Sequence, residues 1–137
     1  MLRMMAMAVA VLGLSQAVAS AADGPDLKAE SIKFNYFTKG GRKYVEVVGT
    51  VRNVGNRPLS AFHRSHEVRL YEGRTLRATT NFGSVPVRGT IVVKYVRLLT
   101  PADGVKPPTF LLRIDYEPDT AYDVNYKNNR LSRVLGK

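Results

Sequence analysis

The chain of 137 residues carries 21 Lys and Arg against 11 Asp and Glu, a net charge of +10, and 45% of its residues are hydrophobic. This length suits one domain, and the apolar content is too high for a disordered polymer. The chain contains no Cys, which excludes a disulfide framework, a thiolate metal site and a Cys nucleophile. A packed apolar core must therefore stabilise the fold.

Residues 1–21 have the three-part pattern of a secretory signal peptide. A single cation, Arg3, precedes an apolar run at 4–14, and small residues follow at 17–21. A membrane anchor is the alternative, but Ser15 and Gln16 interrupt the run before it reaches the roughly 20 apolar residues that a span needs. We expect cleavage here and a periplasmic or extracellular location for the mature domain.

Beyond a short polar lead-in at 22–30, apolar runs alternate with turn signals about every ten residues, which is typical of an all-β protein. The first predicted strand spans 31–38. Gly40 and Gly41 then supply the positive φ values that a tight hairpin requires. The second strand spans 43–54, and alternation predicts four inward residues on it, Val45, Val47, Gly49 and Val51.

Five more strands are predicted along the chain, at 65–71, 75–81, 90–99, 109–117 and 131–135. Their inward residues include Val68, Leu70, Phe110, Leu112 and Ile114. The run at 90–99 does not alternate cleanly, so we expect either a bulge or partial cover on both of its faces. The segment 100–108 holds three prolines and is predicted as a loop.

Seven short strands and no helix of normal length favour an all-β fold, an immunoglobulin-like antiparallel two-sheet β-sandwich. Each sheet has one apolar face, and it buries that face against the other sheet. The predicted organisation is a signal peptide at 1–21, a lead-in at 22–30 and one domain at 31–137.

Three segments carry short signatures: 45–55 (VEVVGTVRNVG), 87–93 (VRGTIVV) and 112–129 (LRIDYEPDTAYDVNYKNN). Together they resemble the CARDB-type domain, an immunoglobulin-like module of secreted and cell-surface bacterial proteins. Asn53 and Gly55 match its N-x-G signature. Its last signature is matched by Asp115, Pro118, Asp119, Asn125, Asn128 and Asn129, whereas Asp123 replaces the usual Glu and Glu117 is an extra acid. The resemblance implies adhesion or the binding of a ligand or partner, not catalysis.

The acidic and amide-rich segment at 115–129 offers the oxygen ligands that Ca²⁺ prefers. The candidate ligands are Asp115, Asp119, Asp123, Asn125 and Asn129. Their spacing does not match an EF-hand loop. The favoured interpretation is that these side chains accept hydrogen bonds from backbone N–H groups in a long turn.

The two histidines, His63 and His66, are three residues apart and would begin a Zn²⁺ or Cu²⁺ site only if the backbone turned between them. In an extended segment their side chains point to opposite faces. We therefore favour a surface or edge-strand position for the pair.

Basic residues are the largest compositional anomaly. The third, sixth and seventh strands of an immunoglobulin-like sandwich are neighbours in one sheet, and alternation places Arg69 and Arg113 on its outer face, with Arg130 or Arg133 beside them. Guanidinium groups in a row suit carboxylate or phosphate ligands. The alternative is that these arginines form ion pairs with Glu67, Asp115 or Glu117 and keep the sheet soluble.

No nucleophile elbow, His-Glu-x-x-His motif or Gly-rich phosphate loop is present. Asp115 and Glu117 share a face, but a carboxylate pair on an exposed strand lacks an enclosing pocket. We expect no enzyme activity, no cofactor and no nucleic-acid partner. The predicted function is binding of an anionic envelope polymer or a protein partner through a basic sheet face. The alternative is a structural subunit or assembly factor that pairs its sheet edges with a partner's strand.

Overall fold

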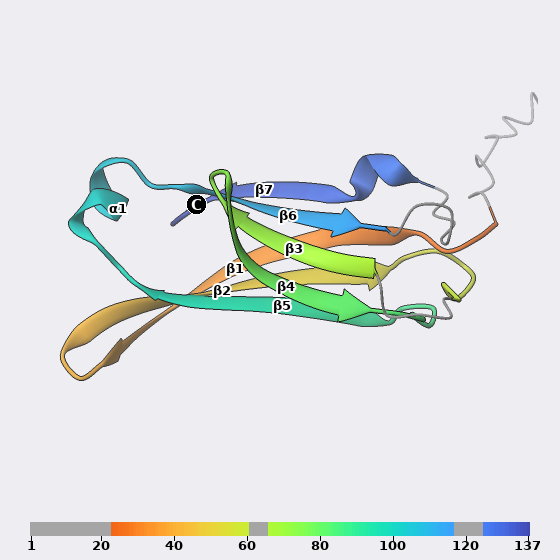
Figure 1. Cartoon of the computed structure of the whole chain (residues 1–137), viewed down its shortest axis with the longest axis horizontal. Helices are drawn as coiled ribbons and strands as arrows, with labels where there is room; N and C mark the ends of the chain where they lie inside the picture. The colour runs from red at the N-terminus through yellow and green to blue at the C-terminus, as the bar shows by residue number, and fades with distance from the viewer. Residues whose placement is uncertain (1–22, 61–65, 117–124) are drawn as a thin grey trace, which may run out of the picture.

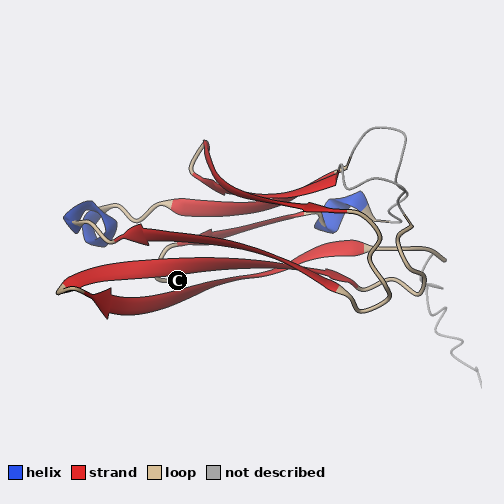
Figure 2. Ribbon diagram, turned by 60° about the horizontal axis from the view of Figure 1, so that its bottom comes forward, coloured by secondary structure: helices blue, strands red, loops and turns tan. Residues whose placement is uncertain are grey.

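The computed structural model describes residues 23–60, 66–116 and 125–137, which form seven strands in two layers (Figures 1 and 2). The strands are β1 (Leu27–Lys39), β2 (Arg42–Asn53), β3 (His66–Glu72), β4 (Thr75–Phe82), β5 (Thr90–Leu98), β6 (Thr109–Asp115) and β7 (Arg130–Val134). The predicted signal peptide at 1–21 lies outside the described residues.

One sheet has the order β1-β2-β5 and the other has the order β4-β3-β6-β7, and all pairs of neighbours are antiparallel. The predicted all-β two-sheet sandwich is therefore confirmed, as is the expectation that the third, sixth and seventh strands share a sheet. The fourth strand pairs with the third. The fifth strand returns to the first two, so the chain crosses between the layers as in immunoglobulin-like folds.

Alternating apolar residues form the core between the two sheets, as predicted. The inner faces of β2, β3 and β6 contribute Val45, Val47, Val51, Val68, Leu70, Phe110, Leu112 and Ile114, each at most 5% exposed. Gly49 lies where a side chain has no room, since an added Cβ would stand 2.6 Å from Leu112 Cδ1 in the facing sheet. Glycine at this position therefore lets Leu112 of the facing sheet pack directly against the β2 backbone.

The first strand begins earlier than its alternation indicates. β1 starts at Leu27, so part of the expected lead-in at 22–30 belongs to the sheet, with Leu27 and Ala29 fully or almost fully buried. The register with β2 shifts between Ala29 and Ser31. This bulge places an extra residue, Glu30, in the strand and breaks the period-two pattern that identifies a strand in a sequence.

The irregular strand β5 contains no bulge. It pairs with β2 without a register shift from Thr90 to Leu98, so its broken alternation comes from exposed valines on its outer face. The loop expected at 100–108 holds a single helical turn, α1 (Pro101–Val105), and a 3₁₀ turn, η1 (Tyr126–Asn128), precedes β7. No helix within the described ranges is long and apolar enough to cross a bilayer.

A half-buried arginine connects the two sheets. Arg97 of β5 donates hydrogen bonds from both terminal nitrogens to Asp103 of α1, each at 2.8 Å, and from Nε to Glu72 of β3 at 2.9 Å. The hydrogen bonds from Arg97 lower the pKa of Asp103 to about 2. Because the three side chains come from different elements, this cluster holds α1 and β5 against the facing sheet.

The Asn-x-Gly signature has a structural explanation. Asn53 is fully buried, and its Oδ1 accepts hydrogen bonds from the backbone N–H groups of Asp26 and Gly55. Its Nδ2 donates to the carbonyls of Arg57 and Val85. A Cβ at Gly55 would stand 2.2 Å from the Gly24 carbonyl oxygen. The pair therefore holds three chain segments together at one end of the sandwich.

Candidate functional site

Three of the four predicted ligand-binding arginines lie in one row across the outer face of the four-stranded sheet. Arg69 is paired in register with Arg113, and Arg113 with Arg130, so the three side chains come from adjacent strands β3, β6 and β7. Arg69 and Arg113 are partly exposed and Arg130 is exposed. The sequence prediction of a basic row on this face therefore describes the positions correctly.

Two acids neutralise most of this row. The carboxylate of Asp115 accepts hydrogen bonds from Nε and Nη2 of Arg113, at 2.7 and 2.8 Å. It also lies 3.1 Å from Nη1 of Arg69. Glu67 accepts a hydrogen bond from Arg69 Nε at 2.6 Å. Tyr71 accepts hydrogen bonds from Arg69 and Arg113, and the guanidinium carbon of Arg113 lies 4.9 Å from the centre of its ring.

The hydrogen bonds to Tyr71 and then to Glu67 raise the pKa of Arg69, and the hydrogen bond to Asp115 raises the pKa of Arg113. The ion pairs expected as the alternative for this surface are thus present with Glu67 and Asp115. Glu117 lies outside the described residues. The N–H groups of Arg69 and Arg113 mostly donate to acceptors within the protein, so few of them are left to bind an external anion.

Arg133 is not part of the row. It is paired with the inward-facing Phe110, and its side chain reaches the other sheet. There it donates a hydrogen bond to the carbonyl of Ile32 and lies over the ring of Phe34 at 5.0 Å. Arg133 therefore connects the β7 edge to β1, and of the two residues predicted to lie beside Arg69 and Arg113 only Arg130 does so.

The cation candidates do not converge in the described part of the chain. Asp115 binds the two arginines, Asn125 caps η1 by accepting a hydrogen bond from the Lys127 backbone N–H, and Asn129 is 93% buried where β7 begins. Asp119 and Asp123 lie outside the described residues. No group of three or more His, Asp or Glu side chains that could hold a metal occurs among residues 23–60, 66–116 and 125–137.

His66 is buried, which corrects its predicted surface position. It is the first residue of β3, is fully buried on the inner face, and packs against the rings of Phe82 and Tyr116 at 5.4 and 5.5 Å. His63 lies outside the described residues. His66 shares its face with Val68 and Leu70, so alternation along β3 already contained the signal that places it in the core.

The sequence prediction missed the outer face of the three-stranded sheet. The register places six partly or fully exposed apolar side chains on it: Phe37, Tyr44, Val48, Val92, Val96 and Leu98. Phe37 lies opposite Tyr44, and Tyr44 lies opposite Leu98. Phe37, Val92, Val96 and Leu98 are 38 to 47% exposed. The broken alternation at 90–99 was the available signal, because valines occur on both faces of β5.

Lys28 and Arg52 lie on this face at the end away from the hairpin, where Arg52 pairs with Glu30. Four further cations accompany the apolar side chains, namely Lys33, Lys39, Arg42 and Lys94, and all four are exposed. None of them belongs to an ion pair in the described part of the chain. Glu46, an acid of the same face, accepts a hydrogen bond from Asn35. We call these four cations and the six apolar residues the cationic face.

The cationic face extends onto a projecting hairpin. Figure 1 shows the ends of β1 and β2, in orange and yellow, leaving the body of the sandwich at the lower left. The rings of Phe37 and Tyr44 are stacked on this hairpin, with centroids 5.2 Å apart and planes 10° apart. Gly40 and Gly41 form its turn at positive φ, and a Cβ at either would meet nothing within 4 Å. The tip therefore stands free of the sandwich.

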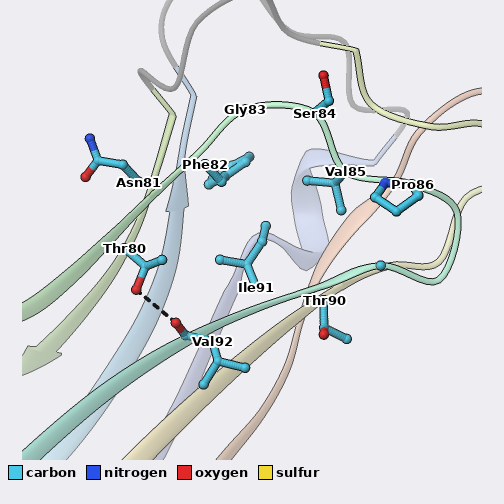
Figure 3. Close-up of a pocket in the computed structure, with 11 residues that line it drawn as sticks. Thr80, Asn81, Phe82, Gly83, Ser84, Val85, Pro86, Thr90, Ile91 and Val92 are labelled. Carbon is cyan, nitrogen blue, oxygen red and sulfur yellow. Dashed lines mark hydrogen bonds between the residues drawn. The ribbon is translucent and has the colours of Figure 1, made fainter.

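A cleft of about 690 Å³ separates the end of β4 from the start of β5 (Figure 3). Phe82, Val85 and Ile91 group between the two segments, and the hydroxyl of Thr80 donates a hydrogen bond to the carbonyl of Val92 at 2.9 Å, which joins the two strands beside the cleft. None of the described residues that line the cleft ionises near neutral pH. They offer hydrogen-bonding groups and an apolar floor, and no side chain suited to acid–base catalysis.

Comparisons with known proteins give no function. No protein-family model and no curated protein matches the chain. A crystal structure of a protein from Archaeoglobus fulgidus is similar over 77% of this chain and 93% of that one, at 11% sequence identity and a TM-score of 0.29.

Proposed function

We propose that this protein is an exported, non-catalytic binding module of the cell envelope that recognises an anionic ligand through its cationic face. The observation that carries the proposal is the contrast between the two outer sheet faces. Arg69 and Arg113 are neutralised by acids on their own sheet, whereas Lys33, Lys39, Arg42 and Lys94 have no ion-pair partner among the described residues. Cations without internal partners attract anionic groups of a ligand, which supply the missing opposite charge.

The position of the four cations supports contact with an extended ligand. Lys33 and Lys94 lie on opposite sides of Val48 in one cross-strand row, and Lys39 and Arg42 lie at the hairpin end of the same face. The cations are therefore spread along the sheet and do not surround a single point. An acidic polymer or another surface with repeated carboxylate or phosphate groups matches this distribution better than a single small anion does.

Edge pairing with a partner's strand, the structural alternative, is less favoured. Arg133 donates to a β1 carbonyl at Ile32, and Thr80 donates to a β5 carbonyl at Val92. Both edges of the three-stranded sheet thus have side-chain contacts from the facing sheet, and such cover protects an edge from strand addition.

Binding of the exported protein to alginate, an acidic polysaccharide, tests the proposal. We expect affinity to fall steeply as salt is raised, because the contacts are solvent-exposed. Lys33→Gln with Lys94→Gln should weaken binding by about tenfold at low salt. The matched control, Arg74→Gln with Lys127→Gln, removes the same charge from exposed positions elsewhere. Equal weakening by both pairs, or binding that salt does not change, would overturn the proposal.

A further inference from the structure

We infer that the anionic ligand of the cationic face is a lipid surface, on which the sheet docks with its cations at lipid phosphates and its apolar side chains at the level of the headgroups. This inference deepens the proposed function and rests on it. Two features of the face carry it, the apolar stripe that accompanies the cations and the exposed aromatic rings of the projecting hairpin.

The cationic face carries a stripe of exposed apolar side chains, which binding to a soluble polyanion does not require. Val92, Val96 and Leu98 all point outward from β5, each at least 38% exposed, and Phe37 continues the stripe onto β1. Contiguous exposed apolar side chains bordered by polar residues mark surfaces that bind proteins or membranes. Lys94 stands between Val92 and Val96 on the same face, so the cations and the apolar groups would meet one ligand together.

The ring geometry suits an interface between water and lipid. Phe37 and Tyr44 stack across the strands, and Phe37 is 41% exposed. Tyr36, on the opposite face of the same hairpin, is 54% exposed. Tyr and Phe with nearby Lys and Arg are the residues that anchor proteins at membrane interfaces, with the cations reaching the phosphates.

Charge distinguishes the possible partners of the cationic face, a second copy of this chain and an anionic bilayer. A second copy of this chain would bring the same cations against each other on a protein of net charge +10, so self-association through this face is disfavoured. An anionic bilayer attracts each nearby Lys or Arg, by about fivefold in affinity per residue. The cations are spread along the sheet, so several of them would act at once on an extended bilayer surface.

Sedimentation with vesicles tests the inference on the protein expressed from its whole sequence, so that export processing takes place. Vesicles of equal parts phosphatidylglycerol and phosphatidylcholine should bind the protein, and vesicles of phosphatidylcholine alone should not. Phe37→Ser with Val96→Ser should weaken vesicle binding by about tenfold, a much larger loss than the same variant shows with alginate. The control Leu76→Ser, at an equally exposed position on β4, should leave both unchanged.

Because the chain contains no Trp, Phe37→Trp provides a fluorescent reporter at the hairpin. Its emission should shift to the blue on anionic vesicles and not on alginate. Circular dichroism and melting of each variant show whether it is folded. If Phe37→Ser with Val96→Ser proves unfolded, the emission shift of Phe37→Trp decides alone.

Four results would overturn the inference. Binding to alginate without binding to anionic vesicles would contradict it and leave the proposed function intact, whereas binding to neither would contradict both. Vesicle binding without a blue shift and without dependence on Phe37 and Val96 would show that only the cations contact the lipid, which contradicts the inferred role of the apolar side chains. A complex with an acidic protein that needs Phe37 and Val96, together with no vesicle binding, would assign the face to a protein partner.

Discussion

Arg69 and Arg113 stand directly opposite each other on adjacent strands, and the carboxylate of Asp115 lies within 3.1 Å of both guanidinium groups. Like charges directly opposite each other on a sheet are destabilising. Asp115 offsets that repulsion through a bidentate contact with Arg113 and a shared contact with Arg69. The outer face of the four-stranded sheet therefore holds an internal ion-pair network of Arg69, Arg113, Glu67 and Asp115, and Arg130 continues the row in register.

Asp115→Asn should destabilise the protein by about 1 to 2 kcal/mol, because it removes the bridging charge and leaves Arg69 and Arg113 to repel each other. Urea denaturation measures the free energy of unfolding. The control Glu30→Gln removes a carboxylate from the more exposed pair with Arg52, and its effect should stay below about 1 kcal/mol. Equal effects of the two substitutions would contradict the bridging role of Asp115.

The Asp103 carboxylate makes stability depend on acid pH. Its pKa in the folded protein, about 2, is below the ordinary value of 3.8 because Arg97 donates two hydrogen bonds to it. A lowered pKa means that the folded state binds the proton less readily than the unfolded state does. The contribution of this carboxylate is therefore complete above about pH 4 and is lost as the pH falls towards about 2.

Between about pH 5 and pH 2, the wild-type protein should lose about 1 to 2 kcal/mol more stability than the Asp103→Asn variant does. Urea denaturation series at several pH values check this difference. Parallel pH profiles for the two proteins would show that the contact of Arg97 with Asp103 adds no stability.

Asn53→Ala should be among the most destabilising polar substitutions, at about 2 to 4 kcal/mol, because it removes four side-chain hydrogen bonds from a fully buried site. Thermal and urea unfolding measure the loss. Asn35→Ala offers a control on the exposed part of β1, where one hydrogen bond of 3.3 Å to Glu46 is removed and a change within about 0.5 kcal/mol is expected. A small effect at Asn53 would show that the backbone groups it binds find other partners.

Alternation along single strands predicted much of the fold. The inward positions of Val45, Val47 and Val51 follow from a period of two, and the same rule placed Arg69 and Arg113 on one outer face. Alternation failed where the chain departs from that period. The bulge at Glu30 concealed the first residues of β1, and the outward valines of β5 suggested a bulge that is not there.

The sequence by itself determined the fold class, the buried faces and the outward direction of Arg69 and Arg113, because each depends on local spacing along the strands. Only the tertiary structure decided which charges are neutralised. Asp115 reaches Arg69 on the neighbouring strand, Arg133 turns to the other sheet, and Lys33 and Lys94 meet no acid among the described residues. The energy of a charge depends on its neighbours in space, and those neighbours are set by sheet order and register between segments far apart in the chain.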